Sequence, residues 1–133
     1  MQIGEAARLT GVSAKMIRHY ESIGLIPLPD RRDSNYRDYG HHDVHRLAFV
    51  RRARDLGFSM DEIRDLLRLW GDKDRSSAEV KRLTESHIDE LDAKIRLLRG
   101  MRQTLATLAD ACDGNERPDC PIIDELAGKG RGR

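Results

Sequence analysis

Long apolar runs are absent from this chain of 133 residues. The longest, at residues 47–50, is far shorter than the roughly 20 residues that a membrane-spanning helix needs. The first residues lack the basic and apolar regions of a secretory signal. Cysteine is scarce, and two cysteines are too few for a scaffold held together by disulfides. We therefore expect a cytoplasmic protein that makes no membrane contact.

Recognisable catalytic motifs are also absent. The sequence has no phosphate-binding glycine loop, no His-Glu-x-x-His zinc motif and no nucleophile elbow. Carboxylates such as Asp61, Glu62 and Glu79 stand at expected helix starts, where capping explains them better than catalysis does. We therefore expect a protein that is not an enzyme.

Basic residues are concentrated in the first part of the chain. Residues 1–54 hold ten lysines and arginines against six acidic residues, a net charge of +4, whereas residues 55–133 have a net charge of −3. Nineteen of the 24 basic residues are arginines, whose forked side chains suit phosphates and base edges. This distribution indicates a nucleic-acid partner, although a genomic bias toward arginine would give the same composition.

Residues 3–24 predict two short helices around a tight turn. Thr10-Gly11 breaks the first helix, and Ser13 is suited to cap the second. Three residues of the second helix lie toward one side: Met16, Ile17 and Tyr20. Four polar residues with helical spacing form another side: Lys15, Arg18, His19 and Ser22. A basic stripe on a short capped helix is typical of a helix-turn-helix recognition helix, while an ordinary polar helix surface is the alternative.

Residues 27–40 favour a small β-hairpin. Pro27 and Pro29 end the helical region, and Asp33-Ser34-Asn35 is a typical turn sequence. A hairpin of this kind would form a wing whose side chains can grip DNA phosphates. The candidates for this role are Arg31, Arg32, Tyr36 and Arg37. A solvated basic loop is the alternative.

Residues 43–71 predict a second pair of helices. Asp43 is suited to cap a helix that runs to about Leu56, and Ser59 begins a capping box with Glu62. The last helix carries an apolar stripe that we expect in the core: Met60, Ile63, Leu66, Leu67 and Trp70. The histidines at positions 41, 42 and 45 are interpreted as exposed imidazoles at a helix start rather than as a metal site.

Residues 76–111 predict one long helix of roughly 50 Å. Ser76 and Glu79 form a capping box at its start. A stripe along it has the alternating three- and four-residue spacing of a coiled coil and is apolar except at Arg102: Ile88, Leu91, Ile95, Leu98, Arg102 and Leu105. Because a small domain cannot cover so long a helix, we expect a homodimer in which two such helices pair.

Two cysteines flank a polar loop near the end of the chain. Cys112 follows the long helix, and Cys120 precedes Pro121, a residue favoured at the first position of a helix. A helix start at Cys120 should lower the pKa of its thiol. Three interpretations stay open: a disulfide used as a redox switch, two unrelated buried thiols, and a two-thiolate site for a soft ion such as Cu(I). Zn(II) would need more ligands than these two residues supply.

Several stretches of the sequence resemble the MerR family of bacterial transcription regulators. They are Ile-Gly-Glu-Ala-Ala at 3–7, Ile-Arg-His-Tyr-Glu at 17–21 with Gly-Leu at 24–25, Asn-Tyr-Arg-Asp-Tyr at 35–39, and residues 54–63. The segments 109–112 and 119–123 resemble the copper-efflux (CueR/HmrR-like) subgroup. The resemblance covers residues 1 to about 127.

This resemblance implies a mainly α fold. A winged helix-turn-helix DNA-binding domain would occupy residues 1–72, a long antiparallel coiled-coil dimerisation helix 73–111, a metal-binding loop with a short helix 112–127, and a disordered tail 128–133. The homodimer would bind double-stranded promoter DNA in which the spacer between the two promoter elements is longer than the optimum for RNA polymerase. Metal binding would then distort the DNA so that RNA polymerase can engage both elements.

The resemblance also implies roles for individual residues. It assigns DNA binding to Lys15, Arg18, Tyr20, Arg31, Tyr36, Arg37 and Arg54. Cys112 and Cys120 match the metal-binding thiolates, and Ser77 of the partner subunit matches a position that is cysteine in members sensing divalent ions. The implied effector is Cu(I), with Ag(I) or Au(I) also effective. A thiol redox-sensing regulator that uses Cys112 and Cys120 is the first alternative, and a metal carrier or buffer is the second.

Overall fold

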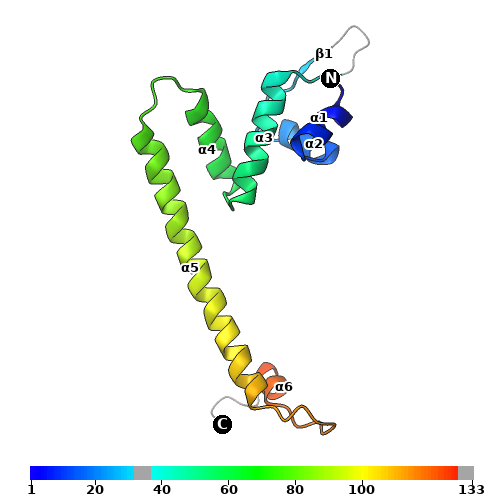
Figure 1. Ribbon diagram of the computed structural model, residues 1–133, viewed down its shortest axis with the longest axis vertical. Coiled ribbons are helices and arrows are strands. Elements are labelled where there is room, and N and C mark those ends of the chain that lie inside the picture. Colours follow the sequence, from blue (N-terminus) through cyan, green and yellow to red (C-terminus); the bar gives the residue numbers. More distant parts are fainter. Residues whose placement is uncertain (32–36, 129–133) are drawn as a thin grey trace. The chain divides into compact units, whose positions relative to one another are not determined.

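The computed structural model describes residues 1–31 and 37–128, with the Arg31 side chain left out (Figure 1). These residues form two compact units that divide between Leu83 and Thr84. Within the described ranges the fold is mainly helical, and none of these helices is long and apolar enough to cross a membrane. Of the tail at 128–133, predicted to be disordered, residues 129–133 lie outside the described residues, and the Gly128 amide donates to the Glu125 carbonyl at 3.0 Å.

The predicted helix-turn-helix is confirmed in the first unit. Helix α1 (Ile3–Thr10) ends at Gly11, whose positive φ of 73° lets its amide donate back to the Ala7 carbonyl. Helix α2 (Ala14–Ser22) begins after Ser13, whose hydroxyl accepts a hydrogen bond from the Met16 amide at 3.2 Å. The turn between the two helices is therefore fixed by local chemistry that the sequence specifies.

A two-stranded hairpin follows, as predicted. Strand β1 (Asp30–Arg31) pairs antiparallel with β2 (Arg37–Asp38), with Asp30 opposite Asp38. The turn of the wing at residues 32–36, which includes the candidates Arg32 and Tyr36, lies outside the described residues.

The second pair of helices consists of α3 (His41–Asp55) and α4 (Met60–Gly71). Helix α3 begins three residues earlier than an N-cap at Asp43 predicts, so the assignment of Asp43 as N-cap is wrong. Gly40 is the N-cap, and because it has no side chain, the Asp43 carboxylate accepts from the Gly40 amide at 2.8 Å from inside the first turn. The capping box of α4 is confirmed by hydrogen bonds in both directions between Ser59 and Glu62.

The core of the first unit is built from residues of α1 to α4 and of the segments between them, including Tyr39 directly after β2. Its most deeply buried members are Ala6, Ile17, Tyr39, Leu47, Val50 and Ile63. The expectation that Trp70 belongs to this core is wrong, since its side chain is 43% exposed. Trp70 stacks on Phe49 of α3 with ring centroids 4.6 Å apart, so it lies on the side of α4 that faces α3, with much of its surface uncovered. Leu69 is buried but is not part of this core cluster.

The second unit contains most of helix α5 (Ser77–Asp110) and the short helix α6 (Pro121–Leu126). With 34 residues, α5 is about 50 Å long. Its start is capped by Ser76, whose hydroxyl accepts from the Ala78 amide at 3.0 Å. The coiled-coil stripe lies open in the single chain, with Ile88, Leu98 and Leu105 each about half exposed or more. A helix surface of this kind needs a partner to cover it.

Candidate DNA-binding face and thiolate pair

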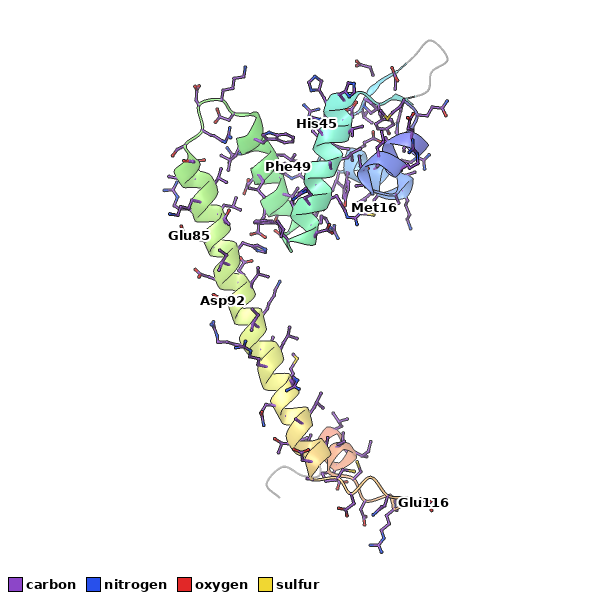
Figure 2. All side chains as sticks on the ribbon, viewed as in Figure 1. Met16, His45, Phe49, Glu85, Asp92 and Glu116 are labelled. Atoms are coloured by element: carbon purple, nitrogen blue, oxygen red, sulfur yellow. The ribbon has the colours of Figure 1, made fainter. Side chains whose placement is uncertain are left out.

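Helix α2 separates its polar residues from the core. Lys15 and Arg18 are exposed, as are His19 and Ser22, whereas Ile17 on the opposite side is fully buried. Met16, labelled on this helix in Figure 2, lies at the border between the two sides. The predicted basic stripe is therefore accessible along one side of a helix that the core holds in place.

Tyr20 differs from the other residues assigned to DNA contact. Only 4% of its surface is exposed, and it packs in the hydrophobic core with Ile17. The reason is its spacing, because a residue three positions after a buried one returns to the same side of a helix. The structure gives Tyr20 a packing role, and its contact with DNA stays a prediction.

The wing is fastened to α2 through a buried carboxylate. Glu21 accepts a hydrogen bond from Nη1 of Arg37 at 2.7 Å and another from the Tyr39 hydroxyl at 3.0 Å. Burial is the largest cause that raises the pKa of Tyr39 above its ordinary value, and the hydrogen bond to Glu21 is the second largest. Arg37 thus holds the wing strand against α2 in addition to its predicted phosphate contact.

Sequence reasoning missed Glu21, although one signal was available. Glu21 lies four residues after the buried Ile17 and therefore on the core side of α2. A carboxylate at such a position needs a cation or hydrogen-bond donors to offset its desolvation. Arg37 and Tyr39 are those partners.

Arg54 is exposed on α3 and lies close to the start of α2. Together with Gly11, Ser13, Met16 and Arg51 it lines an open cavity of about 410 Å³. This position suits the predicted contact of Arg54 with a phosphate. The Arg31 side chain, assigned the same role, lies outside the described residues, as does Tyr36.

The two cysteines approach each other across their loop. Cys120 is the N-cap of α6 with Pro121 at the first helical position, as predicted. The two Sγ atoms are 3.8 Å apart, and both cysteines are free and partly buried. A disulfide requires about 2.05 Å, whereas two metal–thiolate bonds of about 2.3 Å in line would span a little over 4 Å. The sulfur atoms are therefore too far apart for a disulfide, and their separation lies close to the span of a two-coordinate site.

The surroundings of Cys120 favour its thiolate. The amide of Ile123, in the first turn of α6, has the largest effect and lowers the pKa of the Cys120 thiol from its ordinary value. Partial desolvation acts in the opposite direction, and the Ile122 amide and the Cys112 thiol lower the pKa further. A thiol with a lowered pKa is prepared to bind a soft metal ion or to react with an oxidant.

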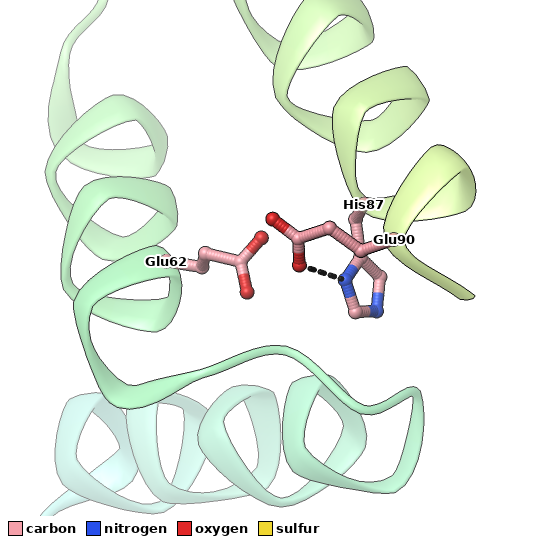
Figure 3. A group of neighbouring side chains, drawn as sticks. All are labelled: Glu62, His87 and Glu90. Atoms are coloured by element: carbon pink, nitrogen blue, oxygen red, sulfur yellow. Dashed lines mark ion pairs between the residues drawn. The ribbon is translucent and has the colours of Figure 1, made fainter. Parts of the chain in front are cut away.

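Three further residues of α5 complete the description. Ser77, the proposed selectivity residue, is the first residue of the helix and is exposed. Farther along, His87 and Glu90 form an ion pair one turn apart, with Nδ1 of His87 3.8 Å from Oε2 of Glu90 (Figure 3).

Comparison with known proteins identifies the class of protein that this fold defines. The model of the MerR HTH family regulatory proteins matches residues 1–70, and the MerR DNA-binding model matches residues 44–108. Heavy metal-dependent transcription regulator 2 of Rhizobium meliloti (strain 1021) is 56% identical, over 96% of this chain and 86% of that protein. The HTH-type transcriptional regulator CueR of Escherichia coli O6:H1 is 41% identical, over 96% of this chain and 95% of that protein.

A solved structure agrees with this assignment. The transcription regulator PbrR691 from Ralstonia metallidurans CH34, crystallised with lead(II), is 35% identical with a TM-score of 0.82, covering 95% of this chain and 98% of that one. The chain belongs to the MerR family of helix-turn-helix transcription regulators. Members of this family bind promoter DNA as dimers and are regulators rather than enzymes.

Proposed function

We propose that this protein is a transcription regulator that responds to Cu(I) and is also triggered by Ag(I) or Au(I). The observation that carries the proposal is the pair of free thiols, Cys112 and Cys120, with sulfur atoms 3.8 Å apart. Soft thiolates select soft ions, and two thiolates around a monovalent ion leave only one net negative charge to accommodate. Relatives named as heavy metal-dependent regulators and as CueR support a heavy-metal effector.

In the proposed mechanism, residues 1–72 bind the promoter, residues 73–111 pair the two subunits and residues 112–127 bind the metal. The promoter elements are separated by too long a spacer, and metal binding bends and undertwists the DNA so that RNA polymerase engages both. The exposed side chains of Lys15, Arg18 and Arg54 support their role in DNA contact. In this proposal the side chains of Arg31, Tyr36 and Arg37 hold the wing on the phosphate backbone.

The direct test is an anaerobic titration of the protein with Cu(I) against a strong chelator, followed by X-ray absorption. We expect one ion per subunit with two short sulfur bonds in the wild type and the loss of this site in Cys112→Ser. Wild-type protein that binds no Cu(I) tightly, or binds it with additional nitrogen ligands, would contradict the proposal.

Redox sensing is the second candidate, because the same two thiols lie close together and the pKa of Cys120 is lowered. Oxidation would have to bring the sulfur atoms from 3.8 Å to about 2.05 Å. Formation of the disulfide under mild oxidant, with a change in transcription and no requirement for metal, would favour it. A metal carrier or buffer is disfavoured because it has no use for the DNA-binding half that defines the family.

Replacing Ser77 with cysteine tests the proposed basis of ion selectivity. We expect the Ser77→Cys variant to gain a transcriptional response to Zn(II) or Hg(II), because a third thiolate adds the negative charge that a divalent ion requires. The measurement is reporter transcription over a series of metal concentrations. Ser86→Cys, which adds a thiol elsewhere on α5, serves as the control. An unchanged ion profile in Ser77→Cys would count against the role of this position.

A further inference from the structure

Both ends of the recognition helix α2 are bounded by turns that contain a left-handed glycine. Gly11 precedes the helix with a φ of 73°, and Gly24 follows it with a φ of 71°. Each turn presents backbone carbonyl oxygens at the C-terminal end of a helix, α1 in the first case and α2 in the second. Such carbonyls carry partial negative charge and attract cations.

An arginine from α3 occupies the first turn. Nη1 of Arg51 donates a hydrogen bond to the Gly11 carbonyl, 40 residues away in the sequence. Nε of the same guanidinium donates to the Asp55 carboxylate at 3.2 Å, which fixes its orientation. A Cβ atom at position 11 would approach Nη1 of Arg51 to 2.6 Å, so the flexible end of this arginine would have to move, whereas the positive φ itself favours glycine here.

An arginine from α4 occupies the second turn. Nη1 of Arg64 donates to the Gly24 carbonyl and Nη2 donates to the Ile23 carbonyl, both at 3.4 Å. The fork of one guanidinium thus spans two successive carbonyls beyond the end of α2. The second pair of helices therefore contacts the turn on each side of α2, with one arginine from each helix.

We propose that Arg51 and Arg64 are positioning residues that hold the recognition helix at the angle required to read DNA bases. The inference rests on the proposed role of α2 as the recognition helix. Hydrogen bonds to base edges depend closely on geometry, whereas contacts with phosphates provide affinity for any sequence. Loss of either arginine therefore reduces discrimination between DNA sequences more than it reduces general affinity.

The test compares two duplexes of equal length: one selected by the full-length wild type from a random pool, and a scrambled version of it. We expect Arg51→Met and Arg64→Met each to weaken binding to the selected duplex about tenfold and binding to the scrambled duplex less than twofold. The dependence of affinity on salt should stay unchanged. If either arginine instead contacts a phosphate directly, both affinities fall together and the salt slope drops by about one, which would overturn the proposal.

Control variants separate positioning from charge and from stability. Arg52→Met on α3 and Arg68→Met on α4 remove the same charge from exposed neighbouring positions and should leave the ratio of the two affinities unchanged. Arg51→Lys and Arg64→Lys can still donate to one carbonyl, so they should restore part of the ratio between the affinities for the selected and the scrambled duplex. All variants are compared in protein that melts at the wild-type temperature. Methionine variants with the wild-type ratio would refute the proposal, and a wild type that selects no duplex would refute the recognition role of α2 along with it.

Discussion

Cells that produce the Cys112→Ser variant are expected to show no transcription in response to Cu(I), although the variant binds promoter DNA like the wild type. A serine hydroxyl is a hard ligand that stays protonated, so one of the two proposed bonds to the soft ion is lost. The loss of metal affinity should exceed the roughly 10–100-fold that removal of an outer-shell partner causes. Cys120→Ser should behave in the same way, because neither sulfur alone makes a two-coordinate site.

Reporter transcription and an electrophoretic mobility shift, measured on the same preparations, decide this prediction. Asp113→Asn provides a matched control, since it alters the neighbour of Cys112 in the same exposed loop without removing a sulfur. Failure of either serine variant to bind promoter DNA would mean that the loop supports the DNA-binding fold. This result would contradict the proposal that residues 112–127 bind metal while residues 1–72 bind DNA.

The second large effect is expected from the stripe on α5. The double variant Ile95→Glu, Leu98→Glu places two like charges per subunit where the paired helices should meet, and we expect it to be monomeric. Binding to a palindromic promoter should then weaken by about 100-fold or more, because the two half-sites are no longer engaged by one linked molecule. Sedimentation equilibrium and DNA titration measure the two effects.

Ala93→Glu is the matched control for this variant. It adds a carboxylate to an exposed position on the opposite side of the same helix, two residues from Ile95. We expect it to remain a dimer and to bind DNA normally. A dimeric double glutamate variant would show that the subunits pair through another surface.

Local signals in the sequence predicted the helix boundaries well. Ser13, Ser59 and Cys120 were each expected at a helix start, and each is the N-cap of the helix that follows. The chemistry of a cap involves residues within one turn of each other, so it can be recognised in the sequence. The assignment of Asp43 failed for a related reason, because an acid at the third helical position caps as effectively as one before the helix.

Contacts between distant residues could not be predicted in the same way. The bonds of Arg51 to Gly11 and of Arg64 to Gly24 join residues 40 positions apart. Nothing in the spacing of one helix specifies which turn its arginine will meet. The exposure of Trp70 was missed for a similar reason, because helical spacing gives the side of α4 on which Trp70 lies but not how far α3 covers that side.

The open stripe of α5 has a consequence for how the protein survives in a cell. Leu105 of this stripe, with Leu97 and Met101 beside it, lines an apolar groove of about 590 Å³ that a lone chain leaves open to solvent. A newly made subunit without a partner presents this surface to proteases and chaperones as a partly unfolded protein would. Its lifetime then depends on how quickly it meets a second subunit, so the steady-state amount of regulator rises more steeply than its rate of synthesis.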